Sequence, residues 1–167
     1  MTRLNRSLAT ALLAISVTAA TASAQGTPKP GQAMANNFNS LFTKILAMAK
    51  DFPAEKYDYR PTPEVRSFRE VLIHIMGGGE YAATFLKVEG AQWGDVDATK
   101  YKTKAEVVAL VEKTIAACKD RLKEIDDERW AKTLAPWPAV IEHSAEHFGQ
   151  LVVYYRLNGL VPPESRN

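Results

Sequence analysis

Apolar side chains recur at every third or fourth position in four separate segments of this chain, and this spacing constrains the fold more than any other feature. The period is that of an α-helix, in which residues three and four apart share one face. The predicted helices span residues 34–50, 63–87, 103–125 and 136–158. No segment shows the alternation of a half-buried strand, so we expect an all-α domain.

The ends of these segments carry helix start and stop signals. Thr62 before Pro63 is a good N-cap followed by proline at the first helical position. Thr103 and Glu106 form the pattern of a capping box, and Gly159 predicts the end of the last helix. Four such helices bury their apolar faces most simply as an up-and-down four-helix bundle, in which the second and fourth helices run parallel.

The first 24 residues have the three-part pattern of a secretory signal peptide. Arg3 and Arg6 precede a short apolar run, and small residues follow it as far as Ala24. The run is shorter than the ~20 apolar residues that cross a membrane, and no later segment supplies such a span. We therefore expect cleavage near Ala24, a flexible linker over residues 25–33, a folded domain over residues 34–167, and a secreted or periplasmic protein.

Positive and negative side chains balance once that segment is removed. Two of the 21 Lys and Arg residues lie in it, whereas all 19 Asp and Glu residues lie beyond it. A neutral domain without a basic cluster is not expected to bind nucleic acid. The single cysteine, Cys118, excludes an internal disulfide and lies on an apolar helix face, where we expect a buried, unreactive thiol.

All three histidines of the chain lie in predicted helices and are the candidate metal ligands. His143 and His147 are four residues apart and share one helix face. His74 lies at about the depth of His147 if the second and fourth helices start from the same end of the bundle. Three neutral imidazoles suit a divalent transition metal and leave a position for water; Zn²⁺ or Ni²⁺ is favoured, with Mn²⁺ and Fe²⁺ as alternatives.

The alternative interpretation is that these histidines are ordinary core side chains bonded to carbonyl groups. Two common metal motifs are absent in either case. Glu146 directly precedes His147, so the segment is not the His-Glu-x-x-His of zinc proteases. The repeated Glu-x-x-His of di-iron bundles is also missing. Both enzyme classes are therefore disfavoured.

Two further polar residues share a face with the histidines and are weak candidates for a catalytic role. Glu70 precedes His74 by four residues and can orient it, add a ligand or act as a base, or else pair with Arg66 or Arg69 at the surface. Gln150 follows His147 by three residues and can hold a ligand or a metal-bound water.

A run of three glycines, Gly77 to Gly79, follows His74 by one turn. Each glycine costs a helix up to ~1 kcal/mol relative to alanine. The run therefore indicates a kink, a close approach by another helix, or space kept clear beside a metal; the remaining alternative is that the second helix breaks there.

Two long stretches of the chain resemble the DinB/YfiT family of metalloenzymes. "YDYRPTPEVRSFREVLIHI", residues 57–75, is similar to that family's entry into its second helix, and "HSAEHFGQLVVYYRLNGLVPP", residues 143–163, is similar to its last helix. The resemblance implies a four-helix bundle of mirror-variant handedness and a homodimer. It also implies a divalent metal held by His74, His143 and His147.

The resemblance leaves the reaction open. Characterised relatives include transferases and isomerases that use low-molecular-weight thiols, but those thiols are cytosolic and this chain is expected to be exported. We therefore expect a metal-dependent hydrolase or transferase whose small-molecule substrate is unknown. A non-catalytic exported metal-binding or interaction protein is the alternative.

Overall fold

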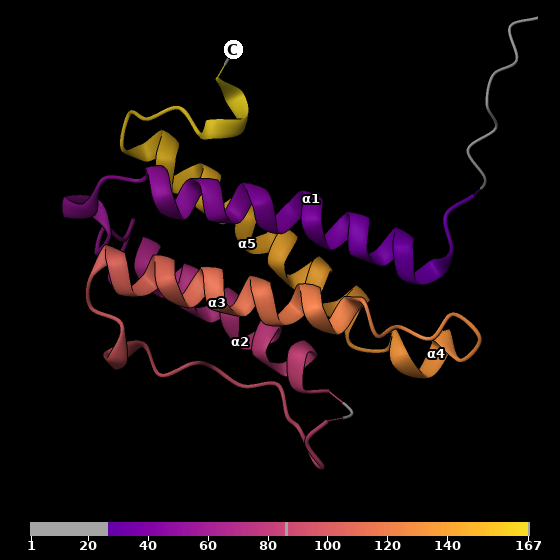
Figure 1. Cartoon of the computed structure of the whole chain (residues 1–167). Coiled ribbons are helices and arrows are strands. Elements are labelled where there is room, and N and C mark those ends of the chain that lie inside the picture. Colours follow the sequence, from indigo (N-terminus) through magenta and orange to yellow (C-terminus); the bar gives the residue numbers. More distant parts are fainter. Residues whose placement is uncertain (1–26, 86, 167) are drawn as a thin grey trace, which may run out of the picture.

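The computed structural model describes residues 27–85 and 87–166. The regular secondary structure in that part of the chain is entirely helical. The bundle consists of four long helices, α1 (Pro30–Asp51), α2 (Phe68–Thr84), α3 (Lys104–Leu122) and α5 (Trp137–Leu157) (Figure 1). Shorter helices lie outside the bundle: η1 (Ala54–Lys56), η2 (Ala98–Lys100), α4 (Trp130–Thr133) and η3 (Pro163–Ser165). The predicted all-α class is confirmed, whereas the predicted signal peptide, residues 1–24, lies outside the described residues.

The helix directions differ from those of a simple up-and-down bundle. Tyr154, near the end of α5, donates a hydrogen bond to the carbonyl of Arg66, just before α2, at 2.6 Å. Arg121, near the end of α3, donates to the carbonyl of Phe85, just after α2, at 3.0 Å. The structure thus has α2 antiparallel to α5 and parallel to α3, and the prediction that the second and fourth helices run parallel was wrong.

The connection between α2 and α3 is what permits this arrangement. A helix of 17 residues, such as α2, is about 26 Å long. The chain from Phe85 to Thr103 is long enough to run back past that whole length, and it does so alongside the bundle (Figure 1). A long return loop of this kind brings its own residues close to α2.

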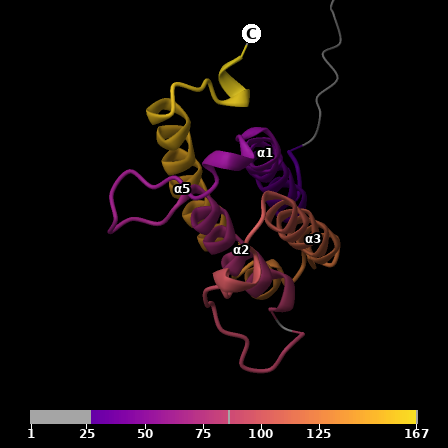
Figure 2. The same ribbon diagram turned by 90° about the vertical axis from the view of Figure 1, so that its left-hand side faces the viewer.

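Each long helix packs against two neighbours. Both α1 and α2 contact α3 and α5, so α1 lies diagonally across the bundle from α2 (Figure 2). Aromatic rings tie one end together: Phe52 stacks on Phe68 at 3.8 Å between centroids, and Tyr155 meets Phe52 edge-on at 4.9 Å. The Tyr155 hydroxyl also donates to the carbonyl of Met48 at 3.0 Å. Contacts of this kind anchor α5, which carries two of the histidines.

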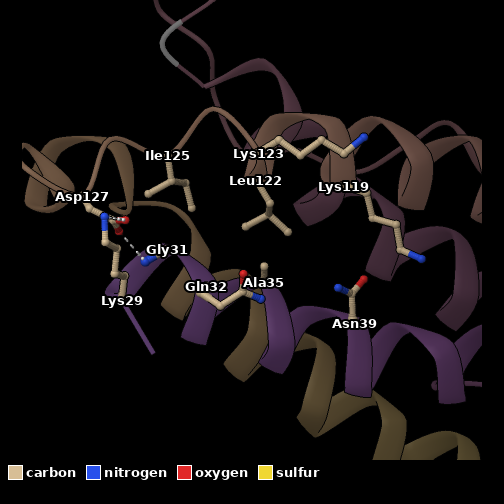
Figure 3. Close-up of a pocket in the computed structure, with 10 residues that line it drawn as sticks. All are labelled: Lys29, Gly31, Gln32, Ala35, Asn39, Lys119, Leu122, Lys123, Ile125 and Asp127. Atoms are coloured by element: carbon tan, nitrogen blue, oxygen red, sulfur yellow. Dashed lines mark hydrogen bonds and ion pairs between the residues drawn. The ribbon is translucent and has the colours of Figure 1, made fainter. Parts of the chain in front are cut away.

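The first helix begins at Pro30, so the last four residues of the predicted linker, residues 30–33, are helical. Proline suits the first helical position, but tertiary contact also holds this turn. The Gly31 N–H donates to the carboxylate of Asp127 at 2.9 Å, beside a groove between the start of α1 and the end of α3 (Figure 3). A Cβ on Gly31 would lie 3.0 Å from Ile125, so this turn packs directly on the connection after α3.

The second helix begins at Phe68 and not at the predicted Pro63. Ser67 is the N-cap, and it forms a capping box with Glu70. The Phe68 N–H donates to the carbonyl of Tyr59 at 3.0 Å, so the segment before α2 folds back on itself as a turn. A local start signal at Thr62 was overridden by this tertiary contact.

Other local signals are confirmed. Thr103 and Glu106 form a capping box at the start of α3, and Gly159 has a φ of +70° directly after the C-cap of α5. Cys118 is buried against the carbonyl of Gly79, and burial raises the pKa of its thiol to about 12. Across the described residues, no helix combines the length and the apolar character that a membrane span requires.

Two glycine substitutions should change stability in opposite directions. Gly149→Ala on α5 should raise the free energy of unfolding by up to about 1 kcal/mol, because no atom lies within 4 Å of the added Cβ and alanine favours a helix. Gly79→Ala should lower it by about 1–3 kcal/mol, because its Cβ would lie 2.6 Å from Thr114 Cγ2. Urea unfolding followed by circular dichroism measures both.

Thr114→Ser, which removes that methyl group, should restore part of the stability lost in Gly79→Ala. An increase in stability for Gly79→Ala equal to that for Gly149→Ala would contradict the close packing of α2 on α3.

Candidate metal centre

The structure brings the three histidines together between α2 and α5. One ring nitrogen from each lies within 4.8 Å of the others, and His143 Nε2 is 3.0 Å from His74 Nε2. His74 lies ten residues before the end of α2, and His147 lies ten residues after the start of α5. Because these helices are antiparallel, both distances are counted from the same end of the bundle. The predicted agreement in depth therefore holds, although the direction assumed for it was wrong.

This group fits a divalent metal ion. Two imidazole nitrogens bound to one ion at ~2.1 Å lie about 3.0–3.4 Å apart for bond angles between 90° and tetrahedral, and the His74–His143 nitrogens are 3.0 Å apart. The pKa of His143 is lowered to about 4, first by burial and then by repulsion from a charged His147 or His74. At neutral pH His143 is thus the neutral imidazole that a metal requires.

His74 is oriented by Asp95, which comes from the long connection between α2 and α3. His74 Nδ1 is hydrogen-bonded to an Asp95 carboxylate oxygen, and this bond lowers the pKa of Asp95. Because an ionised carboxylate can only accept, His74 donates from Nδ1 and keeps the lone pair of Nε2 toward the other histidines. Asp95 was not predicted, since no sequence pattern relates a loop residue 21 positions away to His74.

His147 is oriented by a chain of hydrogen bonds that ends on a backbone carbonyl. The carbonyl of Arg66 can only accept, so the Tyr154 hydroxyl donates to it at 2.6 Å. Tyr154 in turn accepts from the Gln150 amide nitrogen at 2.9 Å. The Gln150 oxygen then faces His147 Nδ1 at 2.8 Å, so His147 donates there and keeps Nε2 free. Of the two roles predicted for Gln150, holding a ligand or a metal-bound water, the structure shows a contact with His147.

Packing, in place of a hydrogen bond, holds His143. Its Nδ1 is buried and has no hydrogen-bond partner among the described residues. The ring of Trp93 meets the imidazole edge-on at 5.0 Å between centroids, and Trp93 also stacks on Tyr81 at 5.7 Å. Trp93 and Asp95 are thus two supports of the centre that come from the same short loop.

Two of the three glycines of α2, Gly77 and Gly78, admit that loop, whereas Gly79 faces Thr114 of α3. A Cβ on Gly77 would lie 2.3 Å from the carbonyl oxygen of Gly94, and one on Gly78 would lie 2.6 Å from the ring of Trp93. Helix α2 continues unbroken through the run. The alternative of a broken helix is wrong. The predicted close approach of another helix is found at Gly79, which packs on α3, whereas the segment that lies on Gly77 and Gly78 is a loop, which was not predicted.

Glu70 has a structural role. Its carboxylate accepts from the Ser67 N–H at 2.7 Å and from Arg60 at 3.2 and 3.0 Å. It pairs with Arg60 and with neither Arg66 nor Arg69, the partners predicted for it at the surface. Its oxygens do not belong to the group of ligand atoms formed by the histidines.

Removing Asp95 should weaken metal binding without unfolding the protein. Asp95→Ala frees the His74 ring to rotate and to change tautomer, and we expect a loss of about 10–100-fold in affinity for Zn²⁺. Competition with a chromophoric chelator measures that affinity. Glu89→Ala, an exposed acidic residue of the same connection, is the matched control. Equal affinities in the two variants would contradict the orienting role of Asp95.

Acid should destabilise the metal-free protein through His143. Its pKa is about 4 in the folded state, whereas histidine in an unfolded chain titrates near 6.5. The unfolded state takes up this proton first, so the free energy of unfolding should fall as the pH drops from about 6.5 to about 4. Urea unfolding at several pH values measures the decrease, which should be smaller in His143→Gln. A decrease of the same size in that variant would assign the effect to other groups.

Comparison with known sequences agrees with this geometry. The chain matches the family model of the DinB superfamily over residues 38–155, a range that includes all three histidines. No curated protein sequence matches the chain. Since the family match covers most of the chain, this protein belongs to the DinB superfamily.

Proposed function

We propose that this protein is an exported, metal-dependent hydrolase or transferase that uses His74, His143 and His147 as its metal ligands. The main observation in support of the proposal is that the three imidazole rings are oriented toward one another. Asp95 and Gln150 occupy the Nδ1 atoms of His74 and His147, which leaves the Nε2 atom of each ring for the ion, and His74 Nε2 lies 3.0 Å from His143 Nε2. Core histidines with a purely structural role also need hydrogen-bond partners, but they are not expected to bring three ring nitrogens within 4.8 Å of one another.

The number of ligands favours catalysis over a structural role. Structural zinc sites are normally closed by four protein ligands, whereas catalytic sites use three and keep one position open. Within the described part of the chain, the group of ligand atoms contains the three histidines alone. A divalent ion bound there, Zn²⁺ or Ni²⁺ in the first place, supplies Lewis-acid chemistry that activates a water molecule or polarises a substrate oxygen.

The protein side chains prepare this position and do not themselves supply a free base. Gln150 is bound to His147 and Tyr154, and Glu70 is bound to Ser67 and Arg60. Neither weak catalytic candidate is therefore available for proton transfer. Their effect is to fix the ligands and the start of α2, which keeps the site preorganised for the ion.

A non-catalytic exported protein that stores or scavenges metal is the second candidate. It would use the same histidines, and it is favoured if spectroscopy of the metal-loaded protein detects a fourth protein ligand. Turnover that disappears in His143→Ala would favour the enzyme.

The proposal also includes the cellular location of the protein, its oligomeric state and the handedness of its helix bundle. The signal-peptide pattern supports export, with cleavage near Ala24 and a secreted or periplasmic protein. Exposed apolar side chains on and just after α5, Val153, Leu157 and Val161, support a homodimer that buries them. The mirror-variant handedness of the bundle is expected from the family resemblance alone.

The first test is the metal content of mature protein purified without a histidine tag. We expect near-stoichiometric divalent metal by mass spectrometry, and loss of it in His74→Ala and His147→Ala. Glu146→Ala is the matched control, because Glu146 is exposed on α5 directly beside His147. Absence of metal from the wild-type protein, even after loading with Zn²⁺, Ni²⁺ or Mn²⁺, would overturn the proposal.

A further inference from the structure

A cleft adjoins the metal centre on the side of the α2 N-terminus. His74 and Asp95 line it together with Arg60 and Arg66, which come from the segment before α2. Val65 and Val96 contribute apolar surface. The cleft is also lined by the carboxylates of Glu64, Glu70 and Asp95, of which Glu70 is bound by Arg60, and Asp95 by His74 and Arg66.

One of the two arginines, Arg60, is already hydrogen-bonded to other groups of the protein. Arg60 donates to both oxygens of Glu70, at 3.2 and 3.0 Å, and to the carbonyl of Val65 at 3.3 Å. Because Glu70 also belongs to the capping box of α2, this ion pair holds the helix start. Arg60 therefore has few donors left for a ligand.

Arg66 is different because its guanidinium is largely free. Among the described residues its side chain makes one polar contact, to an Asp95 carboxylate oxygen at 3.5 Å, which is the long limit of a hydrogen bond. A guanidinium has five N–H donors, so most of them have no protein acceptor here. The side chain is 47% exposed, and a ligand in the cleft can reach it.

The position of Arg66 is nevertheless fixed to the metal centre from two directions. Its backbone carbonyl accepts the Tyr154 hydroxyl that ends the hydrogen-bond chain from His147. Its guanidinium lies beside Asp95, which orients His74. A donor-rich cation thereby lies in the same cleft as His74 and is linked to that ligand through Asp95.

We propose that this cleft selects small acidic substrates that carry two oxygen-donor groups. One anionic group, a carboxylate or a phosphate, is bound by the fork of Arg66, and a second oxygen reaches the open position of the metal. Arginine matches the geometry of both anions with paired N–H donors. The inference rests on the proposed metal function, because the second oxygen needs the ion.

The test compares acetate, which has one anionic group, with acids that carry two such groups, here called two-armed acids, on the metal-loaded protein. Isothermal titration with acetate gives the affinity for the ion alone, and titration with oxalate, malonate, succinate and phosphonoacetate adds a second anionic group at increasing reach. We expect the best two-armed acid to bind at least about tenfold more tightly than acetate, the usual gain from a charge-assisted hydrogen bond. Metal content is measured on the same samples.

Two variants separate a specific contact from general charge. Arg66→Gln should remove the advantage of the two-armed acids while leaving acetate binding and metal content unchanged. Arg60→Gln makes the same change of charge in the same cleft and should alter the advantage less than threefold. Equal effects of the two variants, or no advantage over acetate in metal-loaded wild-type protein, would overturn the inference.

The two proposals fail in different ways. Wild-type protein that takes up no metal removes the metal function and this inference with it. Metal-loaded protein that binds acetate and the two-armed acids equally removes the inference alone. If Arg66→Gln weakens the binding of phosphonoacetate more than that of malonate, Arg66 binds a phosphate-like group; the opposite order identifies a carboxylate.

Discussion

The close contact between α2 and the loop at residues 93–95 is the constraint on which the metal centre depends. A side chain at Gly77 would strike the Gly94 carbonyl, and one at Gly78 would strike Trp93. Only glycine lets the loop lie on the helix, and the loop supplies both the carboxylate on His74 and the ring against His143. Each glycine lowers the stability of the helix by up to ~1 kcal/mol relative to alanine, and the contact with the loop offsets this cost.

The second support of the centre also belongs to the fold. The hydroxyl of Tyr154 joins α5 to the segment before α2, and the same hydroxyl fixes the amide of Gln150 and through it the tautomer of His147. Packing of the two helices and orientation of the ligand therefore share one hydrogen-bond chain. One hydrogen-bond chain can have both roles because α5 runs antiparallel to α2, so the C-terminal half of α5 lies beside the start of α2.

Sequence reasoning succeeded where the signal was local. The helical class, the capping box at Thr103 and the end of the last helix at Gly159 each depend on a few neighbouring residues. The three histidines were identified because so few are present and two share a helix face. The helix directions and the role of Asp95 were missed, since both depend on how the chain from Phe85 to Thr103 returns along the bundle, and the start of α2 was missed because the segment before it folds back as a turn onto Tyr59.

The spacing of the ligands along the chain has a consequence for the order of events in biogenesis. His74 and His143 are 69 residues apart, and closing a loop of that length in an unstructured chain costs about 4 kcal/mol or more. An ion gains little by bridging them before the helices have packed. Packing of the helices removes this cost, so the ion binds more tightly to the folded bundle than to the unfolded chain, and the bound ion in turn stabilises the fold.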